Sequence, residues 1–271
     1  MSLNDPRIQI ATAIPPLEAE PTRKGTTFRG SVYDTSGTRR LVFLKLLKIE
    51  DIAREALCSV LARVVGLPIA QAFYVQVEPA FVPGHRTGNP YGLAFGLERD
   101  CYPTFSIVND QINEDMRRWP EALACGVFDE WIFNGDRLPK NLVFASDGVY
   151  WMIDHDEALP DSAHPGDARY AQILQLLADG KTPLELHRLR REALEFVERL
   201  KKINWDEVLE FVFPSDVVTT GIGGHFEKHI KFLRQRIECM PDILTRSLNI
   251  KQLDMKLDGY AAPEGWKEKK L

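Results

Sequence analysis

The chain contains few cysteines, and no two of them form a C-x-x-C pair. The four thiols are scattered among 271 residues, whereas disulfide frameworks and zinc sites need cysteines at close or regular spacing. No run approaches the roughly 18 apolar residues of a membrane span, and the N-terminus lacks the charged-then-apolar layout of a signal peptide. We therefore expect a cytoplasmic protein with free thiols and no membrane partner.

The chain also lacks an excess of positive charge. Its formal net charge is −5, which gives no bulk electrostatic reason for a direct nucleic-acid partner. The content of 44% hydrophobic and 27% charged residues is that of an ordinary globular protein. The length fits one large domain or two lobes around a shared cleft.

The first part of the chain is expected to be rich in β-structure, after an extended lead-in of about twenty residues. Four segments have the apolar or alternating pattern of strands: residues 25–33, 40–46, 72–78 and 91–97. One helix is predicted among them over residues 50–65, where apolar side chains recur at helical spacing. Gly66 and Pro68 would end that helix.

Beyond about residue 98 the pattern becomes helical, with one embedded hairpin. A helix is predicted over residues 120–134, and a short hairpin over residues 142–153 turns at Ser146-Asp147-Gly148. This order predicts an α+β fold with two lobes, because it lacks the strict strand–helix alternation of a doubly wound fold. The β-rich N-lobe with one helix would cover residues 1–97, and the helical C-lobe residues 98–271.

Three polar residues around this hairpin form the strongest candidate site. Asp136 and Asn141 precede its first strand, and Asp154 follows its second strand. Phosphoryl transfer needs one carboxylate to orient the attacking hydroxyl, and an amide oxygen and a second carboxylate to hold metal ions. Because a tight hairpin would bring all three side chains into one small volume, we expect a kinase site that uses ATP and Mg²⁺.

The segment that holds these residues resembles the HipA-like kinases, which are distant relatives of protein kinases and phosphatidylinositol 4-kinases. The resemblance extends from about residue 25 to residue 160 and is strongest at 128–159. Its most specific part is the N-x-D-x-x-x-K-N pattern, which is matched by Asn134, Asp136, Lys140 and Asn141. The resemblance implies a protein-kinase-like fold and a phosphotransferase activity.

The resemblance also implies roles for individual residues. Asp136 would be the catalytic aspartate, Asn141 and Asp154 would be metal ligands, and Lys140 would lie in the ATP site. The family often has a histidine two residues after the catalytic aspartate, where this chain has Leu138. That difference leaves open how a proton would be transferred and how rigid the loop is. It also leaves open a pseudokinase, which would bind nucleotide without turnover.

A lysine and a glutamate farther upstream complete the expected ATP site. Lys45 ends an apolar strand pattern, and Glu55 lies in the helix that follows. In kinases a strand lysine paired with a helix glutamate reaches the α- and β-phosphates. Lys48 and Glu50 are rivals for these two positions.

A glycine-containing segment before the lysine strand could close over the phosphates. The predicted contacts are Gly25, Thr26, Thr27 and Gly30, through backbone N–H groups and hydroxyls. Ser31 stands where a Walker A loop has its lysine, so that motif is rejected. A plain β-turn explains the same residues equally well.

The connection after residues 91–97 is expected to contact adenine through the backbone of Leu97 and Glu98. The predicted function is transfer of the γ-phosphate of ATP to a Ser or Thr hydroxyl of a protein. A kinase for a lipid or small-molecule hydroxyl, and a nucleotide-binding pseudokinase, remain alternatives. Toxin-type members of the family work beside a DNA-binding antitoxin, so the resemblance also implies an antitoxin-like protein partner.

Overall fold

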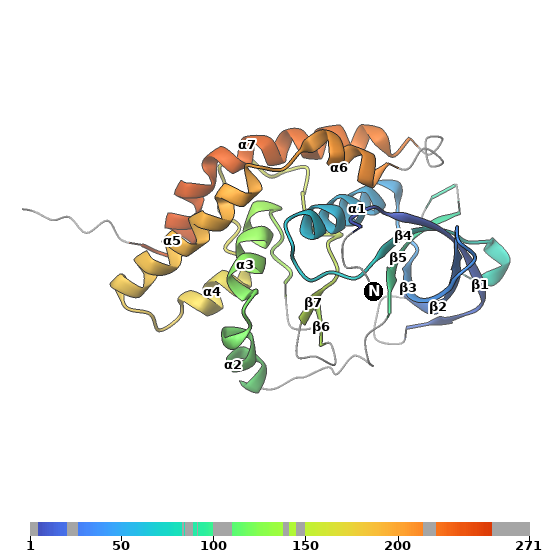
Figure 1. Cartoon of the computed structure of the whole chain (residues 1–271), viewed down its shortest axis with the longest axis horizontal. Coiled ribbons are helices and arrows are strands. Elements are labelled where there is room, and N and C mark those ends of the chain that lie inside the picture. The colour runs from blue at the N-terminus through green and yellow to red at the C-terminus, as the bar shows by residue number, and fades with distance from the viewer. Residues whose placement is uncertain are drawn as a thin grey trace, which may run out of the picture.

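The computed structural model describes nine segments of the chain: residues 5–20, 27–82, 84, 89–90, 92–99, 110–137, 141–144, 150–213 and 221–250. Within them, strands and one helix come first and helices follow, with one short hairpin between the helices. The predicted α+β order is therefore confirmed. Figure 1 shows a β-barrel on one side, the long helices on the other, and the hairpin between them.

The barrel is built from five strands in the order β1-β2-β3-β5-β4. Their bounds are β1 (Gln9–Ala19), β2 (Thr27–Asp34), β3 (Arg39–Lys45), β4 (Ala72–Gln76) and β5 (Leu93–Glu98). Parallel pairing of β1 with β4 closes the barrel, and the other neighbours are antiparallel. Apolar side chains from every strand fill its interior, among them Ala11, Val32, Leu44, Val75 and Ala94.

Strand β1 corrects one prediction. The first twenty residues were expected to form a lead-in, but residues 9–19 belong to the barrel. The strand pairing shifts register between Ile14 and Glu18, around Pro15 and Pro16. Proline has no N–H to donate to a strand ladder, so these two residues interrupt the alternating pattern by which a strand is identified in the sequence.

Helix α1 (Ile49–Val64) connects the barrel to the helical part. It contacts β5 on one side and α6 and α7 on the other, and most of its residues are buried. Gly66 ends it at φ 78°, as predicted, where the N–H of Leu67 donates to Ala62 O over 2.8 Å. Because Leu57 and Phe226 belong to one hydrophobic core, that core crosses the predicted lobe boundary.

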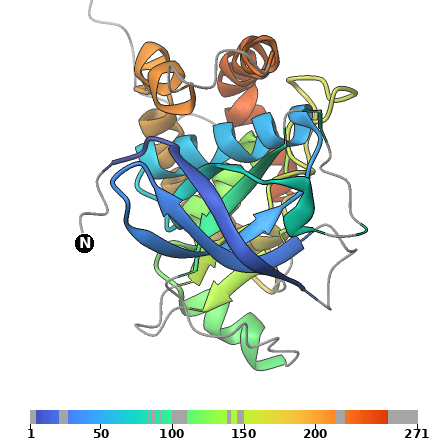
Figure 2. The same ribbon diagram turned by 90° about the vertical axis from the view of Figure 1, so that its right-hand side faces the viewer.

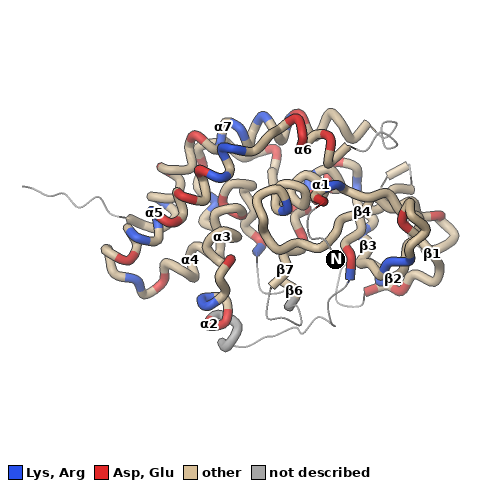
Figure 3. The backbone as a smooth tube through the Cα atoms, viewed as in Figure 1, with Lys and Arg blue, Asp and Glu red and all other residues tan. Residues whose placement is uncertain are grey.

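The helical part contains the hairpin of β6 (Leu142–Phe144) and β7 (Tyr150–Met152). Figure 2 looks onto the barrel, and the C-terminal helices lie behind it. The helices of this part are α2 (Asp110–Arg118), α3 (Ala122–Trp131), α4 (Gln172–Ala178), α5 (Pro183–Leu200), α6 (Trp205–Val212) and α7 (Gly223–Ser247). Acidic and basic residues are mixed along α5 and α7 (Figure 3). In the described part of the chain no helix has the length and apolar character to cross a membrane.

Candidate active site

The loop after α3 is fixed by a buried aspartate. Phe133 has a left-handed backbone, with φ at 58°, so α3 ends earlier than the predicted residue 134. Asp129 lies in the last turns of α3 and is 0% exposed. Its backbone oxygen accepts from Asn134 N over 2.8 Å, and its Oδ1 accepts from Asn134 Nδ2 over 3.2 Å. Asn134 Oδ1 in turn accepts from Asp136 N over 3.1 Å.

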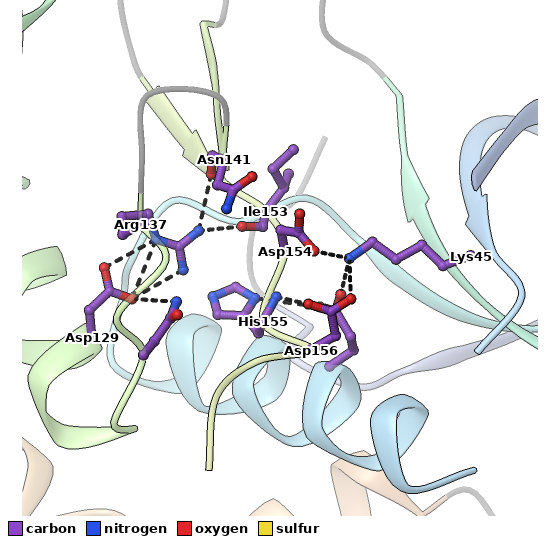
Figure 4. Close-up of polar contacts among 10 residues, drawn as sticks. Lys45, Asp129, Arg137, Asn141, Ile153, Asp154, His155 and Asp156 are labelled. Carbon is purple, nitrogen blue, oxygen red and sulfur yellow. Dashed lines mark hydrogen bonds and ion pairs between the residues drawn. The ribbon is translucent and has the colours of Figure 1, made fainter. Parts of the chain in front are cut away.

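Arg137 connects this loop to the residues that flank the two strands of the hairpin. Its Nε lies 3.1 Å from Asp129 Oδ2, and neither side chain is exposed to solvent. Its Nη1 donates to Asn141 O over 3.0 Å and also to Ile153 O. Burial disfavours the guanidinium, but the carboxylate of Asp129 outweighs it and raises the pKa of Arg137. Figure 4 shows Arg137 between Asp129 and these two carbonyl groups.

Asp136 and Asn141 are brought together, as the sequence predicts. Asn141 Nδ2 donates to Asp136 Oδ2 over 3.1 Å and to Asp136 O over 2.6 Å. Asn141 is 1% exposed, and its Oδ1 has no hydrogen-bond partner among the described residues. A buried acceptor usually has a partner, so this oxygen is suited to a ligand.

Asp154 lies across the base of the same hairpin. The N–H of Ile153 donates to Asn141 O over 3.1 Å, which places the residue before Asp154 against Asn141. Asp154 has a left-handed backbone with φ at 69°, a conformation that is uncommon for residues other than glycine and is frequent at functional sites. Its Oδ1 accepts a hydrogen bond from Lys45.

Lys45 and Glu55 form the ion pair that the sequence predicts. Lys45 Nζ on β3 donates to Glu55 Oε1 on α1, and the side chains are 9% and 0% exposed. Burial disfavours both charged forms, but the carboxylates around Lys45 together raise its pKa, and Lys45 together with the neighbouring His155 lowers the pKa of Glu55. The rival Lys48 lies 3.9 Å from Glu50, and both of these side chains are well exposed.

Three carboxylates lie close together around Lys45. Ligand atoms of Glu55, Asp154 and Asp156 are all within 4.8 Å of one another. Asp156 Oδ2 lies 3.9 Å from Lys45 Nζ. Burial and the two other carboxylates raise the pKa of Asp156 to about 7, although Lys45 acts in the opposite direction. Mg²⁺ in proteins is bound by carboxylate and amide oxygens. The three carboxylates and Oδ1 of Asn141 therefore fit a magnesium ion.

His155 contacts the Glu55 oxygen that does not bind Lys45. Its backbone N–H donates to Glu55 Oε2 over 3.0 Å, and its Nδ1 lies 3.6 Å from the same oxygen. The ring is fully buried, and burial together with Arg137 lowers the pKa of His155. Both oxygens of Glu55 are therefore engaged, one by His155 and one by Lys45.

Two of the four residues predicted to contact the phosphates, Thr27 and Gly30, lie in β2. Gly25 and Thr26 are outside the described residues. Thr27 is buried and pairs with Lys45 in the β2–β3 register. A Cβ on Gly30 would stand 2.3 Å from Leu17 Cδ2, so packing against β1 accounts for this glycine. Their contact with phosphate stays a prediction.

The residues predicted to contact adenine lie at the end of β5. Leu97 is paired with strands on both sides, opposite Phe43 and Ala72. The N–H of Glu98 donates to Gln71 O over 2.8 Å, and its carboxylate lies 3.0 Å from Arg40 Nη1. The Glu98 donor is thus engaged within the fold. Lys140 and Leu138 lie outside the described residues.

The buried charges that position the site were not among the residues predicted from the sequence. Asp129 and Glu130 sit in the otherwise apolar helix α3, and both are 0% exposed. Their partners are Arg137 in the loop and Arg236 on α7. Adjacent carboxylates within an apolar helix are the signal that could have identified them, because buried acids require partners.

The HipA-like kinase family model matches residues 42–178, which is 137 of the 271 residues. No curated protein sequence matches the chain. Among solved structures, the chain is similar to a MAP kinase from Leishmania major, LmaMPK10, at 12% identity and a TM-score of 0.32. That similarity covers 86% of this chain and 82% of the other chain, and its score is too low to support a structural argument.

Proposed function

The chain belongs to the HipA-like kinase family, and from this premise we propose that it transfers the γ-phosphate of Mg-bound ATP to a Ser or Thr hydroxyl of a protein. One observation carries the proposal: Asp136, Asn141 and Asp154 meet at the base of one hairpin, beside the buried pair of Lys45 and Glu55. A site with these five groups has the parts that phosphoryl transfer requires.

Lys45 is proposed to bind the α- and β-phosphates of ATP. Its ammonium is held by Glu55 in a buried position, where a charge interacts strongly because water does not screen it. Glu55 is a positioning residue, since its two oxygens are shared between Lys45 and the backbone of His155. Lys45 also touches Asp154, so the nucleotide and the metal site share one side chain.

Asn141 and Asp154 are proposed to hold Mg²⁺ through an amide oxygen and a carboxylate. Bound Mg²⁺ supplies neutralisation of the negative charge on the phosphates. The unpartnered Oδ1 of Asn141 supports this role, and so does the left-handed backbone that sets the direction of Asp154. Asp156 is the neighbouring carboxylate that could share the ion.

Asp136 is proposed to accept the proton of the attacking hydroxyl. Its backbone is fixed by Asn134, and its carboxylate contacts Nδ2 of Asn141. Asp136 therefore lies directly beside a proposed metal ligand. On this proposal the chain has two lobes, residues 1–97 and 98–271. The first supplies Lys45 and Glu55, and the second supplies Asp136.

The test is incubation with γ-labelled ATP and Mg²⁺, with transfer to protein followed by gel and ATP hydrolysis by released phosphate. We expect Asp136→Asn to lower turnover by about 10²- to 10⁴-fold, the usual contribution of a general base. Asp206→Asn, at an exposed aspartate on α6, is the matched control and should retain the wild-type rate.

Three outcomes separate the alternatives. Equal turnover in Asp136→Asn and wild type would contradict the role of Asp136. Mg-ATP binding by the wild type with no turnover would identify a nucleotide-binding module. Absence of both binding and turnover would overturn the kinase proposal itself.

A further inference from the structure

The segment between β7 and α4 is held in place by a buried arginine of α7. Arg236 is 0% exposed and its Nη2 lies 3.4 Å from Glu130 Oε1 on α3. Its Nη1 donates to Pro165 O over 2.9 Å and to Asp167 O over 2.7 Å. Every direction of this guanidinium is therefore used inside the protein, and it fixes the path of residues 165–167.

Glu130 holds the next part of the same segment. Its Oε1 accepts from Arg169 N over 2.5 Å, and its Oε2 accepts from Ala171 N over 2.8 Å. The residue between them, Tyr170, has a left-handed backbone at φ 60° and a side chain that is 53% exposed. Residues 169–171 are thus fixed by their backbone, while the side chains of Arg169 and Tyr170 face solvent.

The guanidinium of Arg169 lies against the loop that carries Asp136. A Cβ on Gly135 would stand 2.3 Å from Cζ, Nε and Nη2 of Arg169, so these atoms occupy the space that a side chain would take. On another side, Arg169 Cζ lies 5.5 Å from the centre of the Phe133 ring, a distance that allows a cation–π contact. The glycine therefore permits a close approach of a positive charge to the residue before Asp136.

Arg169 has no ion-pair partner among the described residues, although its backbone is fixed by Glu130. Exposed arginines are ordinary, but most have a mobile side chain. Here the backbone is bonded to Glu130, and the guanidinium lies between Gly135 and the Phe133 ring. A planar guanidinium that packs on one side and is open to solvent on the other is suited to bind a carboxylate through two parallel hydrogen bonds.

We propose that Arg169 binds a carboxylate of the phosphoacceptor, so that the kinase selects Ser or Thr in an acidic peptide. This rests on the proposed function, because it places the acceptor hydroxyl at Asp136. One guanidinium matches the single charge of a carboxylate, whereas a phosphate group carries about −1.5 to −2. Arg236, the other guanidinium beside Phe133, is saturated by carbonyl groups. The exposed ring of Tyr170 offers the adjoining surface on which an acceptor peptide could pack.

The experiment uses the full chain, Mg-ATP and a degenerate peptide library with a central Ser or Thr. Each flanking position is fixed in turn as Asp, Glu, Asn or Gln, so that only charge differs between matched peptides. We expect kcat/KM to be about fivefold or more higher for the acidic peptide at one or more positions, the value of an exposed ion pair of about 1 kcal/mol.

Variants then assign this preference to one side chain. Arg169→Gln should bring the acidic peptide down to the rate of its amide partner, and Arg169→Lys should retain part of the preference. Arg199→Gln is the matched control, because Arg199 is also an exposed arginine that lies over an aromatic ring. Its Cζ lies 4.5 Å from the centre of the Phe196 ring on α5. This control should keep the full preference.

The possible failures are distinguishable by measuring phosphate release from Mg-ATP in the same samples. If ATP is turned over but the wild type shows no acidic preference, or if Arg169→Gln retains it, the role of Arg169 is overturned and the kinase proposal stands. If a non-peptide acceptor alone is phosphorylated, the acidic peptide is likewise the wrong substrate class. If Mg-ATP is neither bound nor hydrolysed, both proposals fail together.

Discussion

Replacement of Arg137 by methionine tests whether one buried guanidinium sets the geometry of the whole site. Met has a similar length and no charge, so Arg137→Met removes the partner of Asp129 while filling most of the space. The change also removes the donor shared by Asn141 O and Ile153 O. One carbonyl group belongs to Asn141, a proposed metal ligand, and the other belongs to Ile153, which precedes the second proposed ligand, Asp154.

The expected loss of folding stability is large. Asp129 and Arg137 are both 0% exposed at the side chain, and removal of one partner of a buried ion pair costs about 3–5 kcal/mol because the other charge stays buried. Native domains are stable by only about 5–15 kcal/mol. Arg137→Met should therefore unfold at a clearly lower urea concentration, or fail to fold at all. The variant Arg137→Lys keeps a charge for Asp129 but cannot reach the two carbonyl groups together, so its loss should be intermediate.

Urea unfolding followed by tryptophan fluorescence measures these losses. The double variant Arg137→Met/Asp129→Leu removes both charges, and we expect it to be more stable than Arg137→Met, since a buried pair can often be replaced by apolar residues at little cost. Lys201→Met breaks the exposed pair with Glu198 on α5 and is the control, which should unfold at nearly the same urea concentration as the wild type.

Either of two results would contradict the structural role of Arg137. One is a loss below about 1 kcal/mol in Arg137→Met. The other is a double variant whose loss equals the sum of the two single losses, which would mean that the two side chains do not interact.

Three further predictions concern the metal site, the nucleotide site and the response to pH. Asp154→Asn should weaken the Mg²⁺-dependent part of ATP affinity by about tenfold or more, measured by calorimetry with and without Mg²⁺; an unchanged Mg²⁺ dependence would exclude Asp154 as a ligand. Lys45→Met should raise the KM for ATP or lower turnover by about tenfold, a loss of about 1.4 kcal/mol, whereas Lys48→Met should stay within about twofold; the reverse result would make Lys48 the nucleotide lysine. Burial and Arg54 lower the pKa of His229 from 6.5 to about 4, so the unfolded chain takes up a proton first as pH falls, and stability should drop by up to about 3 kcal/mol between pH 6.5 and 4. His229→Gln should flatten this part of the unfolding curve, and an unchanged slope would show that His229 does not titrate in that range.

Much of the site could be predicted because its residues lie next to strongly local signals. Asp136 and Asn141 follow a helix and precede a strand, and a hairpin must return Asp154 to the same place. The Lys45–Glu55 pair was predictable for a similar reason. A strand, a short connection and a helix bring these two residues together with little freedom.

What the sequence did not reveal depends on contacts between distant segments. The parallel pairing of β1 with β4 joins residues about sixty positions apart, and no local pattern specifies it. The prolines of β1 hide the strand for the physical reason that they donate no hydrogen bond. Asp156 has no pattern of its own either. Its proximity to Lys45 follows from the return of the chain after Asp154.

Helix α3 shows how two parts of the site are connected. Its consecutive residues Asp129 and Glu130 are both buried, and successive side chains on a helix point in directions about 100° apart. Asp129 therefore binds the loop of Asp136 through Arg137, while Glu130 binds the segment of Arg169. A rotation or shift of α3 would move both together. The proposed catalytic base and the proposed acceptor-binding residue thus share one rigid support, and a change in the packing of α3 should alter catalysis and acceptor selection at once.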